Sequence, residues 1–69
     1  MIRRPTLAQY AAACDLLLAG ANMHAMALPL SELVKPCARF QSVTGRAFQT
    51  VDAAFTAAQD IVDRRTVAA

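Results

Sequence analysis

Apolar side chains recur at helical intervals through the C-terminal half of the chain. The residues spaced three, four and seven apart are Phe48, Val51, Phe55, Ala58 and Val62. This spacing places the side chains on one face of an α-helix. Since Pro36 fits only near the start of a helix, the pattern predicts a long amphipathic helix over about 36–65. At 1.5 Å per residue, such a helix would be about 45 Å long.

A second, shorter helix is predicted near the N-terminus. Thr6 and Gln9 stand three residues apart, as in a capping box, so the helix should begin after Thr6. Small and aliphatic residues then continue over 7–19, and Gly20 suits a C-terminal cap. Only Gln9 and Asp15 are polar in this segment. A helix that is apolar on nearly all sides needs neighbours on nearly all sides.

Between the two helices, residues 20–35 are expected to form a connection. Prolines and polar residues interrupt it, although Ser31 to Val34 favour a short helical turn. Within the long helix, Gly45 costs about 1 kcal/mol. It follows two β-branched residues, and it marks either a bend or a close approach of another backbone.

The chain as a whole is predicted to be one all-α domain, a helical hairpin that forms a homodimer. A chain of 69 residues is near the size at which one core gives only marginal stability. Its apolar share of 57% is high and its charged share of 17% is low, so a single copy has more apolar surface than it can bury. The residues expected at the dimer interface are Leu17, Phe48, Val51, Phe55, Ala58 and Val62.

The distribution of charge favours an antiparallel dimer. The first half of the long helix region carries Lys35, Arg39 and Arg46, and the second half carries Asp52, Asp60 and Asp63. Two antiparallel copies would therefore place basic halves against acidic halves. Exposed pairs contribute less than ~1 kcal/mol each, so they select an orientation while apolar burial supplies the attraction.

The candidate chemistry is sparse. The two cysteines, Cys14 and Cys37, are not in CxxC spacing, and His24 is the only histidine. These residues are too few for a zinc site of four ligands, and no local motif places a nucleophile beside a base. We therefore expect free thiols, no catalytic residue, no metal and no cofactor, which means a protein that is not an enzyme.

The remaining function classes are binding classes. Tyr10, Arg39 and Arg46 are the candidate partner-contacting residues, because tyrosine and arginine are enriched among the residues that dominate interface energies. The alternative is a small dimeric DNA-binding regulator that uses a basic helical face, with Arg46, Gln49 and Thr50 reaching the bases. A third possibility is a structural subunit of a larger helical assembly. The formal net charge of +2 decides between none of these.

The N-terminal region superficially resembles a secretion signal, with two arginines followed by an apolar run. Asp15 interrupts that run, and no apolar stretch reaches the ~18–20 uncharged residues that a membrane span requires. We therefore expect a cytoplasmic protein that does not bind membranes.

A very short, alanine-rich helical chain without catalytic equipment resembles the accessory proteins that phages and plasmids encode. In length and helical make-up, over the whole chain, it is similar to the small Pseudomonas-phage anti-quorum-sensing proteins. This resemblance implies a helical homodimer that acts as an antiactivator in the host bacterial cytoplasm. The implied partners are a quorum-sensing transcriptional regulator such as LasR and a pilus assembly ATPase such as PilB. The resemblance implies no individual functional residue.

Overall fold

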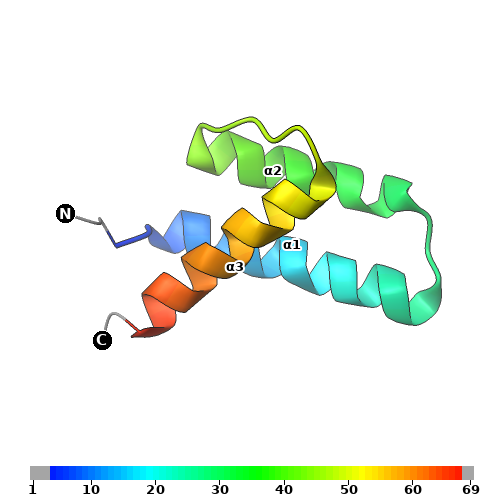
Figure 1. The fold of residues 1–69 in the computed structure, drawn as a ribbon, viewed down its shortest axis with the longest axis horizontal. Helices are drawn as coiled ribbons and strands as arrows, with labels where there is room; N and C mark the ends of the chain where they lie inside the picture. Colours follow the sequence, from blue (N-terminus) through cyan, green and yellow to red (C-terminus); the bar gives the residue numbers. More distant parts are fainter. Residues whose placement is uncertain (1–3, 68–69) are drawn as a thin grey trace.

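A computed structural model describes residues 4–67, which contain helices and no strand. Three α-helices, α1 (Leu7–Met26), α2 (Val34–Thr44) and α3 (Val51–Val67), are joined by a short 3₁₀ helix, η1 (Leu30–Leu33), and by loops. α1 and α2 lie side by side as a hairpin, and α3 crosses α1 obliquely (Figure 1). The predicted all-α class is confirmed.

The capping box at the start of α1 is confirmed as well. The Gln9 backbone N–H donates to Thr6 Oγ1 at 3.1 Å. In return, the Thr6 backbone N–H donates to Gln9 Oε1 at 3.2 Å. Two backbone donors that the helix itself cannot satisfy are thus satisfied by side chains.

The predicted end of the first helix is wrong, because α1 continues through Gly20 to Met26. A Cβ atom at Gly20 would lie only 2.6 Å from Cζ of Phe55, so Gly20 leaves room for the Phe55 ring where α3 crosses α1. α1 ends instead at Ala27, which adopts a left-handed conformation with φ 52°. The Leu28 N–H then donates to the Met23 carbonyl at 2.9 Å, closing a Schellman motif.

The predicted single long helix is also wrong, because the segment 36–65 is divided into α2 and α3. Gly45 ends α2 in a left-handed conformation with φ 67°, and its N–H donates to the Gln41 carbonyl at 2.9 Å. α3 begins after Thr50, whose Oγ1 accepts from the Ala53 N–H at 3.1 Å. A glycine cap at Gly45 and a threonine cap at Thr50, five residues apart, hence replace the bend that the sequence suggested.

Gln41 fixes the loop between these two helices. Besides its backbone bond to Gly45, its Oε1 accepts from the Phe48 N–H at 3.0 Å. The Phe48 ring packs against Phe40, with ring centroids 5.5 Å apart. The loop is therefore held by a polar and an apolar contact at the same residue, and α3 is directed back across the hairpin.

The core lies where the three α-helices meet. Its buried residues are Ala12, Ala13 and Leu16 of α1, Phe40 of α2, and Ala54 and Ala58 of α3. Most of these six are alanines, so the helices approach closely, and among the six only Leu16 and Phe40 are large. Gln9 Nε2, 3.5 Å from the Val43 carbonyl, joins the start of α1 to the end of α2.

Candidate interaction surfaces

The residues predicted to form a dimer interface are largely covered within the chain. Ala58 is buried, Val51 is half-buried, and the remaining four, Leu17, Phe48, Phe55 and Val62, are half-buried and pack against the chain's own core. Folding α3 back across α1 is what covers them. Pairing of these residues with a second copy stays a prediction, and less of their surface is available than one long helix would expose.

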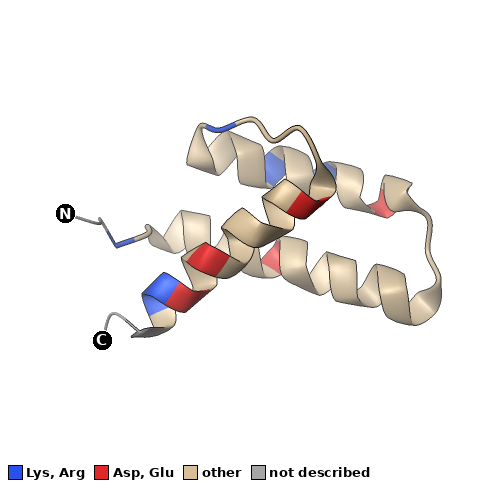
Figure 2. Cartoon of the chain, in the orientation of Figure 1, with Lys and Arg blue, Asp and Glu red and all other residues tan. Residues whose placement is uncertain are grey.

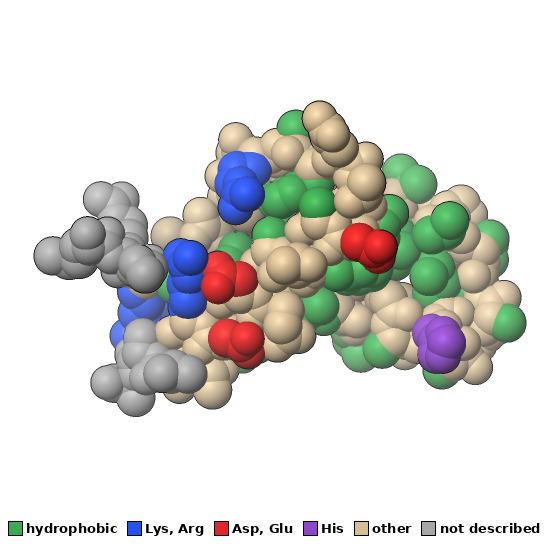
Figure 3. Space-filling view, in the orientation of Figure 1, with side chains coloured by type: hydrophobic (Ala, Val, Ile, Leu, Met, Phe, Trp, Pro, Cys, Tyr) green, Lys and Arg blue, Asp and Glu red, His purple; other side chains and the backbone are tan. Residues whose placement is uncertain are grey.

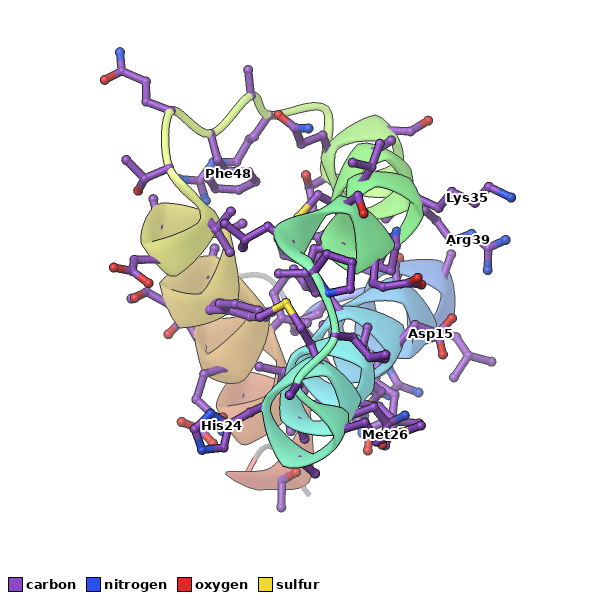
Figure 4. All side chains as sticks on the ribbon, turned by 90° about the vertical axis from the view of Figure 1, so that its right-hand side faces the viewer. Asp15, His24, Met26, Lys35, Arg39 and Phe48 are labelled. Carbon is purple, nitrogen blue, oxygen red and sulfur yellow. The ribbon has the colours of Figure 1, made fainter. Side chains whose placement is uncertain are left out.

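The three predicted partner-contacting residues do not form one surface. Tyr10 lies under Arg65, whose guanidinium carbon is 5.5 Å from the ring centroid. Arg46 is in the α2–α3 loop, and its guanidinium carbon lies 5.0 Å from the centroid of the Phe48 ring. Arg39, on α2, projects on the opposite side from Phe48 and α3 (Figure 4). They contribute to three separate regions.

Arg39 belongs to a groove between α1 and α2, with a volume of about 340 Å³. Its Nη1 lies 3.5 Å from Oδ2 of Asp15 on α1, and both side chains are more than half exposed. Lys35 projects from α2 on the same side (Figure 4). Residues that complete the groove are Leu18, Ala19, Asn22 and Pro36. The groove thus combines an apolar floor with two cations and one carboxylate.

A second hollow is basic. Arg4, Arg46 and Arg64 line a space of about 310 Å³, together with Thr6, Gln9, Thr44 and Ile61. Asp60, also in the lining, binds Nε of Arg64 at 2.9 Å. Two of the segments that line it, the residues just before α1 and the C-terminal half of α3, lie at the end of the molecule that carries both termini (Figure 2). Its arginines are separated by 42 and 18 positions along the chain, so no local sequence pattern connects them.

Large apolar side chains are also exposed. They are Leu7 and Leu18 on α1, at 66% and 61% exposure, and Met26, Leu30 and Val34 around the α1–α2 turn, each at 65%. Figure 3 shows hydrophobic side chains gathered at that end of the molecule. The exposure of Leu7 and Leu18 agrees with the nearly uninterrupted apolar character of the first predicted helix. Met26, Leu30 and Val34 fall in the segment predicted to be a connection, where no helical pattern indicated a surface.

Two titratable side chains, Cys37 and Tyr10, have a raised pKa. Burial raises the pKa of the Cys37 thiol, which keeps it protonated and a poor nucleophile at neutral pH. The pKa of Tyr10 is raised chiefly by a hydrogen bond with the Cys14 side chain. Both cysteines are free, and His24 is exposed in the last turn of α1.

Two kinds of feature are missing from residues 4–67. No three histidine, cysteine or acidic side chains are grouped so that they could hold a metal ion. No helix in this part of the chain combines the length and apolar character needed to cross a bilayer.

Comparison with family models, with curated proteins and with solved structures gave no match. The functional conclusions below therefore depend on the residues of this chain.

Proposed function

We propose that this protein is a non-enzymatic binding module that acts on another protein through the turn-end surface, defined here as Met26, Leu30 and Val34. The observation that carries the proposal is the 65% exposure of each of these side chains. Clustered exposed apolar residues on a small protein are typical of protein-interaction sites.

The chemistry of the turn-end surface indicates the kind of partner. Leu30 begins η1 and Val34 begins α2, four residues further along the same helical stretch. Methionine adapts its shape to irregular apolar surfaces. The cations Lys35 and Arg39 both lie on α2, and Lys35 is next to Val34 in the chain. An apolar partner surface bordered by carboxylates would complement this arrangement.

The partner proposed is a host bacterial protein whose activity is blocked when the surface is occupied. A quorum-sensing regulator of the LasR type and a pilus assembly ATPase of the PilB type are the two candidates, in keeping with the resemblance described above. The protein would then be an inhibitor that works by occupying a surface, with no cofactor and no reaction.

Titration calorimetry with each purified candidate tests this proposal. We expect a discrete complex with at least one of them, and a loss of at least about tenfold in affinity for Val34→Glu, which removes an apolar contact and adds repulsion. Thr56→Glu is the matched control, because it adds the same charge at an exposed position of α3. Absence of binding to both candidates would reject these partners, and equal affinity of Val34→Glu and wild type would reject the turn-end surface.

A second candidate function is supported by the basic hollow. Three guanidinium groups around one space, with only Asp60 to offset them, suit a phosphate group of DNA. In a gel-shift series at rising salt, this function requires binding that weakens steeply with salt and that Arg46→Ala reduces. Absence of binding at moderate salt would reject it.

A further inference from the structure

One face of α1 is covered by no other part of residues 4–67. Viewed along the hairpin, α2 and α3 occupy two sides of α1, and the third side is open (Figure 4). The residues on this open side are Leu7, Ala11, Cys14, Leu18, Ala21 and Ala25, called the α1 stripe below. All are exposed except Cys14, which is half-buried. The buried residues Ala12, Ala13 and Leu16 face the opposite way.

The spacing of the α1 stripe is that of a coiled-coil contact. Successive members are 4, 3, 4, 3 and 4 residues apart, which continues over the full helix. This alternation keeps the side chains on one line where a second helix can pack. Four of the six are alanine or cysteine, so a neighbouring helix backbone can come close.

We propose that a second copy of this chain docks on the α1 stripe, with the two α1 helices antiparallel and their midpoints near Leu16 side by side. This interface differs from the one that the sequence predicted, which used mainly the residues now folded into α3. It also lies outside the turn-end surface, so it goes beyond the proposed function.

The sizes of the side chains favour the antiparallel arrangement. It places Leu7 against the partner's Ala25 and Leu18 against the partner's Cys14, while Ala11 meets the partner's Ala21. Each leucine is thereby matched with a smaller residue. A parallel pair would instead place leucine against leucine in two layers and alanine against alanine in three others. The leucine layers would then keep the helices too far apart for the alanine layers to make contact.

Charge favours the same arrangement. Asp15 borders the α1 stripe on the side of α2, where Arg39 lies 3.5 Å from its carboxylate. Because the two-fold axis passes near this residue, the two Asp15 carboxylates meet on one side of the dimer together with two copies of Arg39 and Lys35, so each Asp15 has the partner's cations within reach. Both members of the Asp15–Arg39 pair are more than half exposed, which leaves them free to exchange partners across the axis. A parallel pair would offset Asp15 toward the uncharged Tyr10 and Leu17.

The area available predicts a reversible dimer. From Leu7 to Ala25 the stripe is about 27 Å long and about one helix wide. That is less than the roughly 800 Å² per partner of a standard stable interface. The mass of the protein should therefore depend on concentration, and the two turn-end surfaces should lie at opposite ends of the dimer.

Sedimentation equilibrium over a wide concentration range is the first test. Wild type should approach twice the 7.4 kDa chain mass when concentrated and return toward one chain on dilution. Leu18→Glu should remain a single chain with unchanged helical circular dichroism, since Leu18 is 61% exposed. The matched control is Val34→Glu, a similarly exposed position outside the stripe, which should dimerise as wild type does. A wild type that stays monomeric throughout, or a Leu18→Glu variant that dimerises normally, would overturn the proposal.

Cysteine cross-linking tests orientation. In a background with Cys14→Ala and Cys37→Ala and with helical content verified, Ala11→Cys chains mixed with Ala21→Cys chains should form a disulfide-linked pair. Either chain alone should form far less, and Ala11→Cys mixed with Ala53→Cys, an exposed site on α3, should form none. Efficient cross-linking of Ala11→Cys with itself would show a parallel pair and contradict the proposal. These results are independent of the affinity of Val34→Glu for a partner protein. Failure of the dimer tests would therefore leave the proposed function standing, and failure of the binding test would leave the proposed dimer standing.

Discussion

Gly20 is a residue for which a glycine in a helical sequence has two possible roles. Glycine ends a helix when the next turn needs a left-handed residue, and it lies inside a helix when a neighbour comes too close for a Cβ atom. Both uses leave the same letter in the sequence. The choice is made by Phe55, which is 35 positions away and whose ring fills the space above Gly20. No pattern within α1 indicates that contact, because Phe55 belongs to α3.

We predict that Gly20→Ala destabilises the protein by about 1–3 kcal/mol, because its methyl group would overlap the Phe55 ring. In an open helix the same substitution would stabilise by up to about 1 kcal/mol, so the sign of the change is diagnostic. Urea unfolding followed by circular dichroism gives the free energy. Adding Phe55→Leu to the variant should recover part of the lost stability. If the double variant loses as much free energy of unfolding as the two single variants together, the overlap is not the cause.

Ala27 is a non-glycine residue in the left-handed region, where the Cβ atom of an L-residue is crowded. We predict that Ala27→Gly raises the free energy of unfolding by about 0.5–1 kcal/mol, measured by the same urea titration. Gly45→Ala is the converse change at the equivalent position of α2, and it should lower stability by a similar amount. A stability unchanged by both substitutions would contradict the left-handed caps.

At the scale of elements, the start of α1 could be predicted and the division between α2 and α3 could not. The capping box is a local pattern, with donor and acceptor three residues apart, and it forms as expected. The seven-residue spacing of Phe48, Phe55 and Val62 is equally regular but misleading, because Phe48 lies in the loop. Its ring reaches the core by stacking on Phe40. A periodic pattern indicates which residues are buried, and it does not show that one helix buries them.

Gln41 makes the break between these elements testable. We predict that Gln41→Ala lowers stability by about 1 kcal/mol and speeds hydrogen exchange at the Phe48 amide, which would lose its acceptor. The α2–α3 loop should open locally while the helices persist. Gln49→Ala, at an exposed loop position, is the control and should change neither quantity. Normal protection of the Phe48 amide in Gln41→Ala would show that the stacking alone holds the loop.

At the scale of the whole molecule, the two ends of the chain are joined by one side chain. Arg65 Nη1 donates to the Pro5 carbonyl at 3.0 Å while its guanidinium covers Tyr10. Sequence reasoning recognised Tyr10 as notable but could not find this partner, 55 positions away. The basic hollow was the least predictable surface at this scale, because its arginines lie on segments that meet only after α3 folds back.

We predict that Arg65→Ala destabilises the protein by about 1–2 kcal/mol, since it removes both a charge-assisted hydrogen bond and a cation–π contact. The neighbouring Arg64→Ala should cost at most about 0.5 kcal/mol, because Arg64 pairs with Asp60 on an exposed helix face. Thermal and urea unfolding of the two variants gives the comparison. Equal losses would contradict a special role for Arg65.

The meeting of Pro5 with Arg65 has a practical consequence for labelling the protein. Figure 1 shows the first and last described segments at one end of the molecule and the α1–α2 turn at the other. A fluorescent protein or immobilisation tag attached to either terminus would therefore extend away from Met26, Leu30 and Val34. Surface-based binding assays can use either terminus for attachment and leave the turn facing solution.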